Sequence, residues 1–189
     1  MVPFSTKLKQ AESEELVGHI APRVVLFDAT VQDWLKHTPD ARAVSLSEWQ
    51  ALSLPEPLTR QPVPVNRDDT AVMMFTSGTA GEPKGAIITH NNLLCAIDAY
   101  TQKLNLTAAD STILAVPIYH ITGLSALLAL FISLGASIWL QHRFNAPQVI
   151  NTLREKNITF LHGSPTIFIL LCQAAREQSA SPVSYTHLR

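Results

Sequence analysis

Residues 70–89 read TAVMMFTSGTAGEPKGAIIT, with an apolar segment at each end and small residues between them. The two apolar ends, 70–75 and 86–89, predict two short strands, because apolar and β-branched residues favour strands. The ten residues between them, 76–85, include three glycines and one proline, which predict a loop. The spacing therefore predicts two neighbouring strands that flank a glycine-rich loop.

The loop is chemically suited to a polyphosphate. Its glycines permit positive φ angles, so that several backbone N–H groups can face one point. Hydroxyl donors stand at Thr76, Ser77 and Thr79, and Lys84 adds a positive charge. The pattern is not a P-loop, because a glycine and an apolar strand follow Lys84 instead of a Ser or Thr that opens a helix. Taken by itself, such a loop is more often an ordinary hairpin turn with a solvated lysine.

Helices and strands alternate on both sides of the loop. We predict strands at 22–28, 41–46, 111–116, 136–140 and 158–161, and helices at 11–20, 31–37, 91–104, 121–134, 146–156 and 164–177. The expected N-caps are Thr30, Asn91 or Asn92, Asn145 and Ser164, and the expected helix ends are Asn105 and Gly135. This rhythm predicts an α/β fold with mostly parallel sheet layers and flanking helices.

Composition excludes several classes of protein. The 189 residues are 47% hydrophobic and 15% charged, which excludes disorder of the highly charged kind. The net charge of −1 offers no basic field, so nucleic acid is not an expected partner. The two cysteines, Cys95 and Cys172, lie in no CxxC or Cys/His cluster, so neither a disulfide framework nor a metal site is expected.

The complete string TSGTAGEPKG resembles the phosphate-binding signature of the adenylate-forming superfamily, which includes the acyl- and aryl-CoA synthetases. Family members usually have a threonine where this chain has Ala80, which removes one hydroxyl. Four further segments also resemble the family. They are residues 89–93, residues 117–123 with the pattern P-x-[YF]-H-x-x-G, residues 134–136 and residues 163–166. The resemblance extends over about 69–173, more than half of the chain.

The resemblance implies a partial N-terminal domain of an adenylate-forming enzyme and a set of site residues. The loop residues that would bind the phosphates of ATP are Thr76, Ser77, Gly78, Thr79, Ala80, Gly81 and Lys84. His120 would be the catalytic residue that meets the substrate carboxylate, and Tyr119, Gly163 and Ser164 would line the substrate pocket with it. A lone histidine beside an apolar helix is more often a core residue, and His162 is assigned to the core or the surface.

The activity that the resemblance implies is that of an AMP-forming carboxylate:CoA ligase. Such an enzyme activates a fatty or aryl acid as an acyl-adenylate and transfers the acyl group to CoA, with ATP, Mg²⁺ and CoA as the required small molecules. Peptide-synthetase adenylation is disfavoured, because residues 118–121 read Ile-Tyr-His-Ile where those domains carry Phe-Asp-x-Ser. The apolar stretch 124–134 favours an apolar or aromatic acid. The sequence indicates no oligomeric state.

Several segments of the superfamily have no counterpart in these 189 residues. They are the downstream segments that hold magnesium, adenine and ribose, together with the small C-terminal domain. We therefore expect a fragment without activity of its own. The alternatives are an inactive nucleotide-binding remnant and an adenylation domain of another branch. The expected division is a helix–strand segment at 1–54, a proline-rich linker at 55–68, the AMP-binding core at 69–178 and a truncated or non-native tail at 179–189.

One apolar stretch raises the question of a membrane. Residues 111–142 contain no Asp, Glu, Lys or Arg, and 123–140 reach the length of a membrane-spanning helix. A buried helix and a buried strand, separated at Gly135, explain the stretch equally well. The start of the chain turns acidic where a signal peptide needs an apolar core. We expect a cytoplasmic protein with no integral span, attached peripherally to a membrane if its substrate is a fatty acid.

Overall fold

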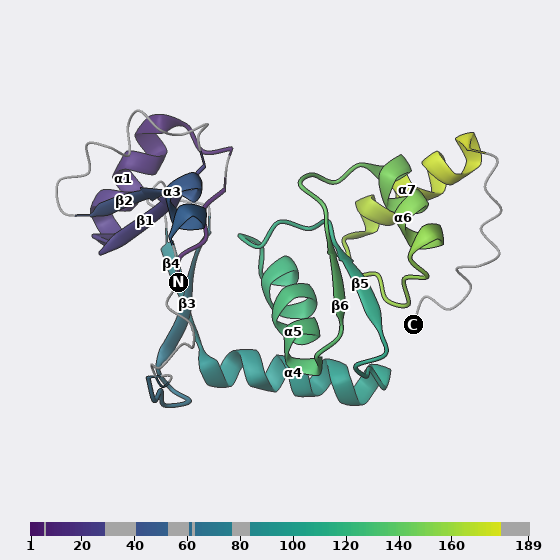
Figure 1. Ribbon diagram of the computed structural model, residues 1–189, viewed down its shortest axis with the longest axis horizontal. Helices are drawn as coiled ribbons and strands as arrows, with labels where there is room; N and C mark the ends of the chain where they lie inside the picture. Colours follow the sequence, from purple (N-terminus) through teal and green to yellow (C-terminus); the bar gives the residue numbers. More distant parts are fainter. Residues whose placement is uncertain (6, 29–40, 53–60, 62, 77–83, 179–189) are drawn as a thin grey trace. The chain divides into compact units, whose positions relative to one another are not determined.

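The computed structural model describes residues 1–5, 7–28, 41–52, 61, 63–76 and 84–178 (Figure 1). Contacts within the chain divide these residues into two units. The larger unit comprises 1–3, 66–76 and 84–178, and the smaller one lies between residues 4 and 65. The predicted helix 31–37 with its cap Thr30 lies outside the described residues.

The smaller unit is a helix–strand–strand–helix segment. Its elements are α1 (Gln10–Ile20), β1 (Val24–Phe27), β2 (Arg42–Ser45) and α3 (Leu46–Ala51). The two strands are parallel, with Val24 opposite Arg42, and Val17, Val25 and Phe27 form the core. These elements confirm the helix predicted at 11–20 and the strands predicted within 22–28 and 41–46.

Helix α3 was not predicted, although its signal is present in the sequence. Ser45 and Glu48 form a capping box: the Ser45 hydroxyl accepts a hydrogen bond from the Glu48 N–H (3.1 Å), and the Glu48 carboxylate accepts one from the Ser45 N–H (2.7 Å). The Ser-x-x-Glu pattern is typical of a helix start. These hydrogen bonds hold the pKa of Glu48 below its ordinary value.

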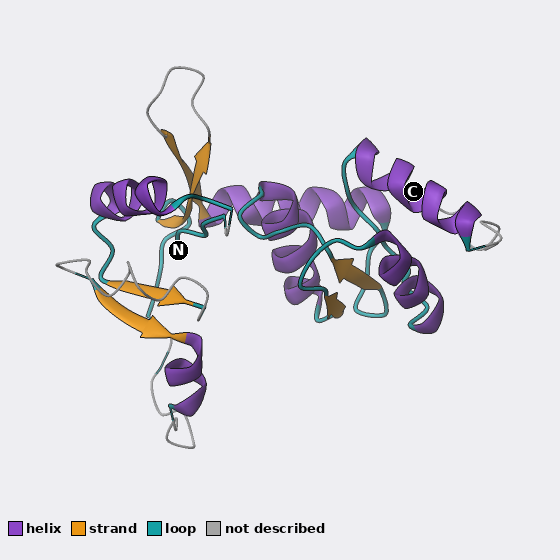
Figure 2. Ribbon diagram, turned by 90° about the horizontal axis from the view of Figure 1, so that it is seen from above, coloured by secondary structure: helices purple, strands orange, loops and turns teal. Residues whose placement is uncertain are grey.

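The larger unit begins with an antiparallel hairpin, drawn in orange at the top of Figure 2. Strand β3 (Thr70–Thr76) pairs with β4 (Lys84–Thr89), with Met73 opposite Ile87 and a register shift near Thr70. This pairing confirms that the loop joins two neighbouring strands instead of opening into a helix. Val72 and Met74 turn their side chains into a buried cluster.

Helix α4 (His90–Leu104) follows β4 without an intervening loop. Its N-cap is Thr89, so the predicted cap at Asn91 or Asn92 is wrong. The Thr89 hydroxyl accepts from the Asn92 N–H (3.2 Å), while the Asn92 side-chain oxygen accepts from the Thr89 N–H (3.0 Å). Asn92 thus serves as the other half of a capping box. At the far end Asn105 adopts a left-handed conformation (φ 53°), which confirms the predicted stop.

The second sheet of the larger unit is parallel. Strands β5 (Ser111–Leu114) and β6 (Ser137–Leu140) pair along their length, and Phe160 adds a single parallel bridge to Thr112. The strand predicted at 158–161 is therefore reduced to one bridge. The Thr159 hydroxyl accepts a hydrogen bond from the Ser111 N–H (3.0 Å).

The apolar stretch 123–140 lies in a π-helix, a short α-helix and a strand. The π-helix η2 (Thr122–Ala129) runs into α5 (Leu130–Leu134), and Gly135 ends the helix with a φ of 66° before β6 begins. Leu127, Leu130 and Phe131 are fully buried. The predicted break at Gly135 is confirmed. No helix among the described residues is both long and apolar enough to cross a membrane.

Strand β6 is not buried, contrary to the prediction. Trp139 is 40% exposed and Leu140 is 73% exposed. The reason is its place in the sheet, because among the described strands only β5 pairs with it. A Lys156 ammonium lies 4.6 Å above the centre of the Trp139 ring and covers part of it.

Two helices complete the unit and pack on one another. Helix α6 (Ala146–Glu155) is capped by Asn145, whose side-chain oxygen accepts from the Gln148 N–H (3.0 Å), as predicted. Helix α7 (Pro165–Glu177) begins after Ser164. The core between these helices and β5 is formed by Ile113, Ala115, Val149, Ile150, Leu153, Leu171 and Ala174.

Candidate functional site

The hairpin β3–β4 carries the predicted phosphate loop. Thr76 and Lys84 are register partners at the end of the ladder, so the two ends of the loop lie opposite one another. The Lys84 side chain is exposed. The predicted residues Ser77, Gly78, Thr79, Ala80 and Gly81 lie outside the described residues, as does the side chain of Thr76.

The turn after β5 carries Tyr119 and His120. The His120 N–H donates to the Pro117 carbonyl (3.0 Å), and the two rings lie 4.6 Å apart between centroids. His120 is exposed among the described residues. The core-histidine alternative requires a buried residue, whereas His120 is exposed in this part of the chain.

Gly123 shapes this turn through close backbone contact. A Cβ built on Gly123 would lie 2.4 Å from the Pro117 carbonyl oxygen and 2.5 Å from that of Val116. Backbone atoms cannot move aside as a flexible side chain can, so only glycine fits there. The start of η2 is thereby held against the strand end from which His120 follows.

Gly163 and Ser164 lie in the segment between Phe160 and α7. A Cβ on Gly163 would lie 3.0 Å from the Ile167 side chain, so this segment is packed against the first turn of α7. Ser164 is the N-cap residue of α7 and is exposed. Its side chain makes no capping hydrogen bond to any described residue.

Sheet topology brings the two predicted pocket segments to one edge. Phe160 pairs in parallel with Thr112 of β5, so the chain leaves both elements in the same direction. Tyr119 and His120 follow β5, and Gly163 and Ser164 follow Phe160. In parallel sheets, ligands bind beyond the carboxyl ends of the strands, where these residues lie.

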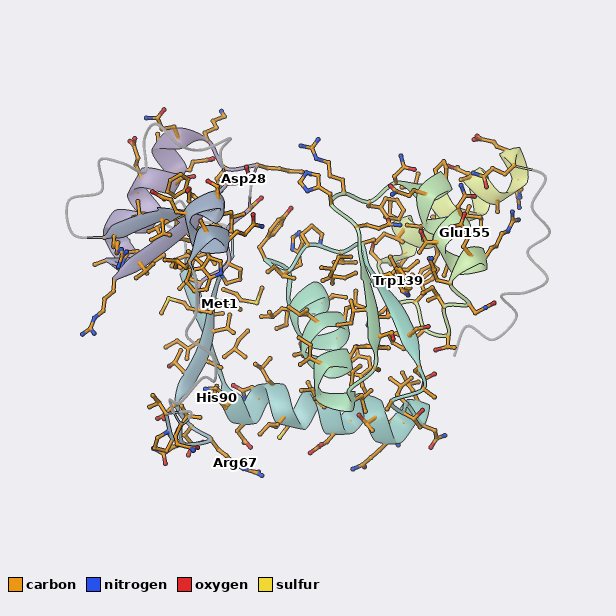
Figure 3. All side chains as sticks on the ribbon, in the orientation of Figure 1. Met1, Asp28, Arg67, His90, Trp139 and Glu155 are labelled. Carbon is orange, nitrogen blue, oxygen red and sulfur yellow. The ribbon has the colours of Figure 1, made fainter. Side chains whose placement is uncertain are left out.

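A hydrophobic cluster connects the hairpin to the His120 turn. Val72 and Met74 of β3 pack with Leu124 of η2, and Ile118 packs against the same cluster. Ile118 and Leu124 stand on either side of the turn that carries Tyr119 and His120. Figure 3 shows the hairpin leading into α4 at the labelled His90. Burial of apolar surface in this cluster thus holds the β3–β4 hairpin against the turn.

Sequence reasoning missed one polar contact in this region. The Tyr100 hydroxyl of α4 lies 2.8 Å from Nε2 of His162, which was assigned only to the core or surface. Burial lowers the pKa of His162. No local signal could have revealed the pair, because the two residues are separated by 62 positions.

Metal-binding side chains do not gather anywhere in the described ranges. No group of three or more His, Cys, Asp or Glu residues there is arranged to hold a metal ion.

Comparison with known proteins identifies relatives over most of the chain. Residues 1–189 match the family described as AMP-binding enzyme. The 2-succinylbenzoate–CoA ligase of Bacillus licheniformis is 31% identical over 159 residues, which are 84% of this chain and 33% of the relative. A feruloyl-CoA synthase of an Amycolatopsis species is 28% identical over 118 residues, which are 62% of this chain and 24% of the relative.

Solved structures share the fold. The O-succinylbenzoate coenzyme A synthetase of Bacillus subtilis, in complex with ATP and magnesium ion, matches with a TM-score of 0.80 and 25% identity over 91% of this chain and 35% of its own. ATP-bound MatB from Rhodopseudomonas palustris matches with a TM-score of 0.81 and 24% identity over 93% and 36%. The chain therefore spans about a third or less of the length of these curated and structural relatives.

Proposed function

Because this chain belongs to the AMP-binding enzyme family, we propose that it forms part of an AMP-forming carboxylate:CoA ligase. The protein would activate a fatty or aryl acid as an acyl-adenylate and transfer the acyl group to CoA. The names of its relatives support this class of reaction, since they include CoA ligases for 2-succinylbenzoate and ferulate.

The observation that carries the proposal is the hairpin with Thr76 and Lys84 opposite one another at the base of the loop. In our proposal the hydroxyls of Thr76, Ser77 and Thr79 donate hydrogen bonds to the phosphates of ATP. Backbone N–H groups of Gly78, Ala80 and Gly81 would do the same, and Lys84 would neutralise charge. The loop would thereby stabilise the negative charge that the departing pyrophosphate gains.

The acid would bind at the carboxyl edge of the parallel sheet. His120 would donate a hydrogen bond to the carboxylate and hold it toward the α-phosphorus, and its exposure supports this role. Tyr119, Gly163 and Ser164 would line the remainder of the pocket. The apolar side chains of η2 favour an apolar or aromatic acid.

The proposed reaction has two steps. A carboxylate oxygen attacks the α-phosphorus, and the bond from this phosphorus to the bridging oxygen breaks as pyrophosphate leaves. The CoA sulfur then attacks the acyl carbon, and the bond from this carbon to the adenylate oxygen breaks as AMP leaves, while the thiol proton passes to solvent. ATP, the acid and CoA are consumed, and acyl-CoA, AMP and pyrophosphate are formed.

Magnesium would reach this site together with ATP. The described residues offer no cluster of ligands for it, and Mg²⁺ in such enzymes is commonly held through substrate phosphates. We assign it no step in this chain.

The division of the chain into 1–54, 55–68, 69–178 and 179–189 is also a proposal. Limited proteolysis tests it, since cleavage is expected first within 55–68. A cytoplasmic location likewise remains a prediction, which fractionation of cells that express the complete protein would test.

The function is tested by acid-dependent exchange of labelled pyrophosphate into ATP, using the full-length protein that contains this chain. The panel of acids includes 2-succinylbenzoate, ferulate, 4-coumarate and a long-chain fatty acid. We expect exchange with at least one of them and formation of its CoA thioester when CoA is added. Exchange without thioester formation would indicate another branch of the superfamily, and no exchange with any carboxylic or amino acid would indicate an inactive remnant.

A further inference from the structure

A hydrogen bond between Tyr100 and His162 joins α4 to the segment that precedes α7. The Tyr100 hydroxyl lies 2.8 Å from Nε2 of His162, and the two ring centroids are 5.7 Å apart. Both side chains are half-buried, so water competes less strongly for the bond than it would at the surface. This side-chain bond connects parts of the larger unit that are 62 positions apart in the sequence.

His162 also contacts a row of aromatic rings. Its ring centroid lies 6.3 Å from that of Phe160, which lies 5.4 Å from that of Phe131. Phe131 is fully buried, and Phe160 is 9% exposed. The row therefore fixes the imidazole between the core of the unit and α4. Desolvation lowers the pKa of His162, which favours the neutral ring.

The position of His162 in the chain gives the bond its significance. The backbone is anchored before it, where the Phe160 N–H donates to the Ser111 carbonyl (3.0 Å), and after it, where the Ile167 N–H donates to the Ser164 carbonyl (3.0 Å). His162 lies between these anchors and directly precedes Gly163. Its side-chain bond therefore influences where Gly163 and Ser164 lie.

Tyr100, at the other end of the bond, lies in the helix that follows the β3–β4 hairpin. Helix α4 starts directly after β4, and Tyr100 lies about 16 Å along the helix from Thr89. The bond thus ties the proposed acid segment to the element that follows Lys84.

We propose that Tyr100 and His162 are positioning residues that hold Gly163 and Ser164 in place for the acid substrate. The pair would set the affinity for the acid and would leave binding of ATP unchanged. This inference rests on the proposed function, which assigns Gly163 and Ser164 to the acid pocket.

The test uses steady-state kinetics of the full-length protein with its best acid. Loss of one half-buried hydrogen bond in Tyr100→Phe is expected to raise KM for the acid about 3- to 10-fold and to leave KM for ATP within about twofold. His162→Leu is expected to have the same effect, and the double variant no more than either single one. His162→Gln keeps a polar nitrogen near the position of Nε2 and should restore most of the affinity.

Thr152→Val is a matched control. It removes one hydroxyl from another contact between elements, in which Gln141 Nε2 donates to Thr152 Oγ1 (3.2 Å), and it should leave KM for the acid unchanged. The proposal is overturned if Tyr100→Phe leaves KM for the acid unchanged, or raises KM for the acid and for ATP equally.

Amide hydrogen exchange separates this inference from the proposed function. Tyr100→Phe should speed exchange of the peptide that covers 160–167 and leave the peptide covering 146–155 at the wild-type rate. If the wild-type protein activates no acid while this local loss of protection is seen, the proposed function fails and the positioning role of the pair stands. Unchanged protection of 160–167 overturns the positioning role in either case.

Discussion

Lys84 supplies the positive charge among the residues assigned to the phosphates of ATP. In Lys84→Ala a charge-assisted contact worth about 1.5–3 kcal/mol is lost, so kcat/KM for ATP should fall about 10- to 150-fold. Thr76→Ala removes a neutral hydroxyl and should cost about 1 kcal/mol, or about fivefold. Adenylation kinetics with ATP varied, and then with two acids of different size, measure both effects.

Lys103→Ala is the matched control for Lys84. Lys103 is an exposed lysine in the last turn of α4, in the same unit, and its loss should leave the ATP dependence unaltered. If Lys84→Ala shifted the preference among acids and left the ATP dependence unchanged, the loop would belong to the acid pocket.

His162 should make the stability of the fold depend on pH. Burial lowers its pKa in the folded state from the ordinary 6.5, so the unfolded chain takes up a proton first as the pH falls. The group has no effect on the free energy of unfolding well above pH 6.5, and it destabilises the fold increasingly as the pH falls through and below that value. Urea unfolding at several pH values should show that the free energy of unfolding falls with decreasing pH in the wild type, and that it falls less in His162→Gln. If the free energy of unfolding depended equally on pH in the two proteins, the lowered pKa of His162 would be contradicted.

Helix boundaries can be predicted from the sequence where the residues that set them are close neighbours in the chain. Asn105, Gly135 and Asn145 stand at helix boundaries for reasons visible in the sequence, namely a left-handed conformation or a side-chain cap. The cap at Thr89 was missed because Thr and Asn both favour this position. Choosing between them required the reciprocal bonds of Thr89 and Asn92.

Neighbouring residues of α5 should differ sharply in their contribution to stability. Phe131 is fully buried and contacts the Phe160 ring, whereas Ile132 is 65% exposed. Phe131→Ala should lower the free energy of unfolding by about 3–5 kcal/mol, because it leaves a cavity in the core. Ile132→Ala on the same helix should change it by no more than about 0.5 kcal/mol. Chemical denaturation of both variants measures the difference, and similar losses would show that α5 packs through another face.

At the scale of the whole molecule, one cluster connects the two proposed binding elements. Met74 of the hairpin and Leu124 of η2 are buried at 6% and 4% exposure in a common cluster. Substituting either with alanine should cost about 2–5 kcal/mol. Because the two side chains share their neighbours, the costs should differ from additivity by about 0.5–3 kcal/mol in the double variant.

Val17 provides the control for the double variant of Met74 and Leu124. It belongs to the core of the smaller unit, which shares no described residue with the Met74 cluster. Val17→Ala combined with Leu124→Ala should therefore be additive within about 0.5 kcal/mol. Urea unfolding of the single and double variants gives both coupling energies. Additive costs for Met74 and Leu124 would mean that the hairpin and the His120 turn are held independently.

Features that depend on neighbouring residues could be predicted from the sequence alone. The sequence around 76–85 predicted the two strands on either side of it, and the alternation of apolar helices and strands predicted an α/β arrangement. The exposure of β6 and the π-helical geometry of η2 depend, in contrast, on the tertiary structure. It alone paired Tyr100 with His162. Turn chemistry and periodicity act over a few residues, whereas burial and contact between distant segments depend on which faces the whole chain packs together.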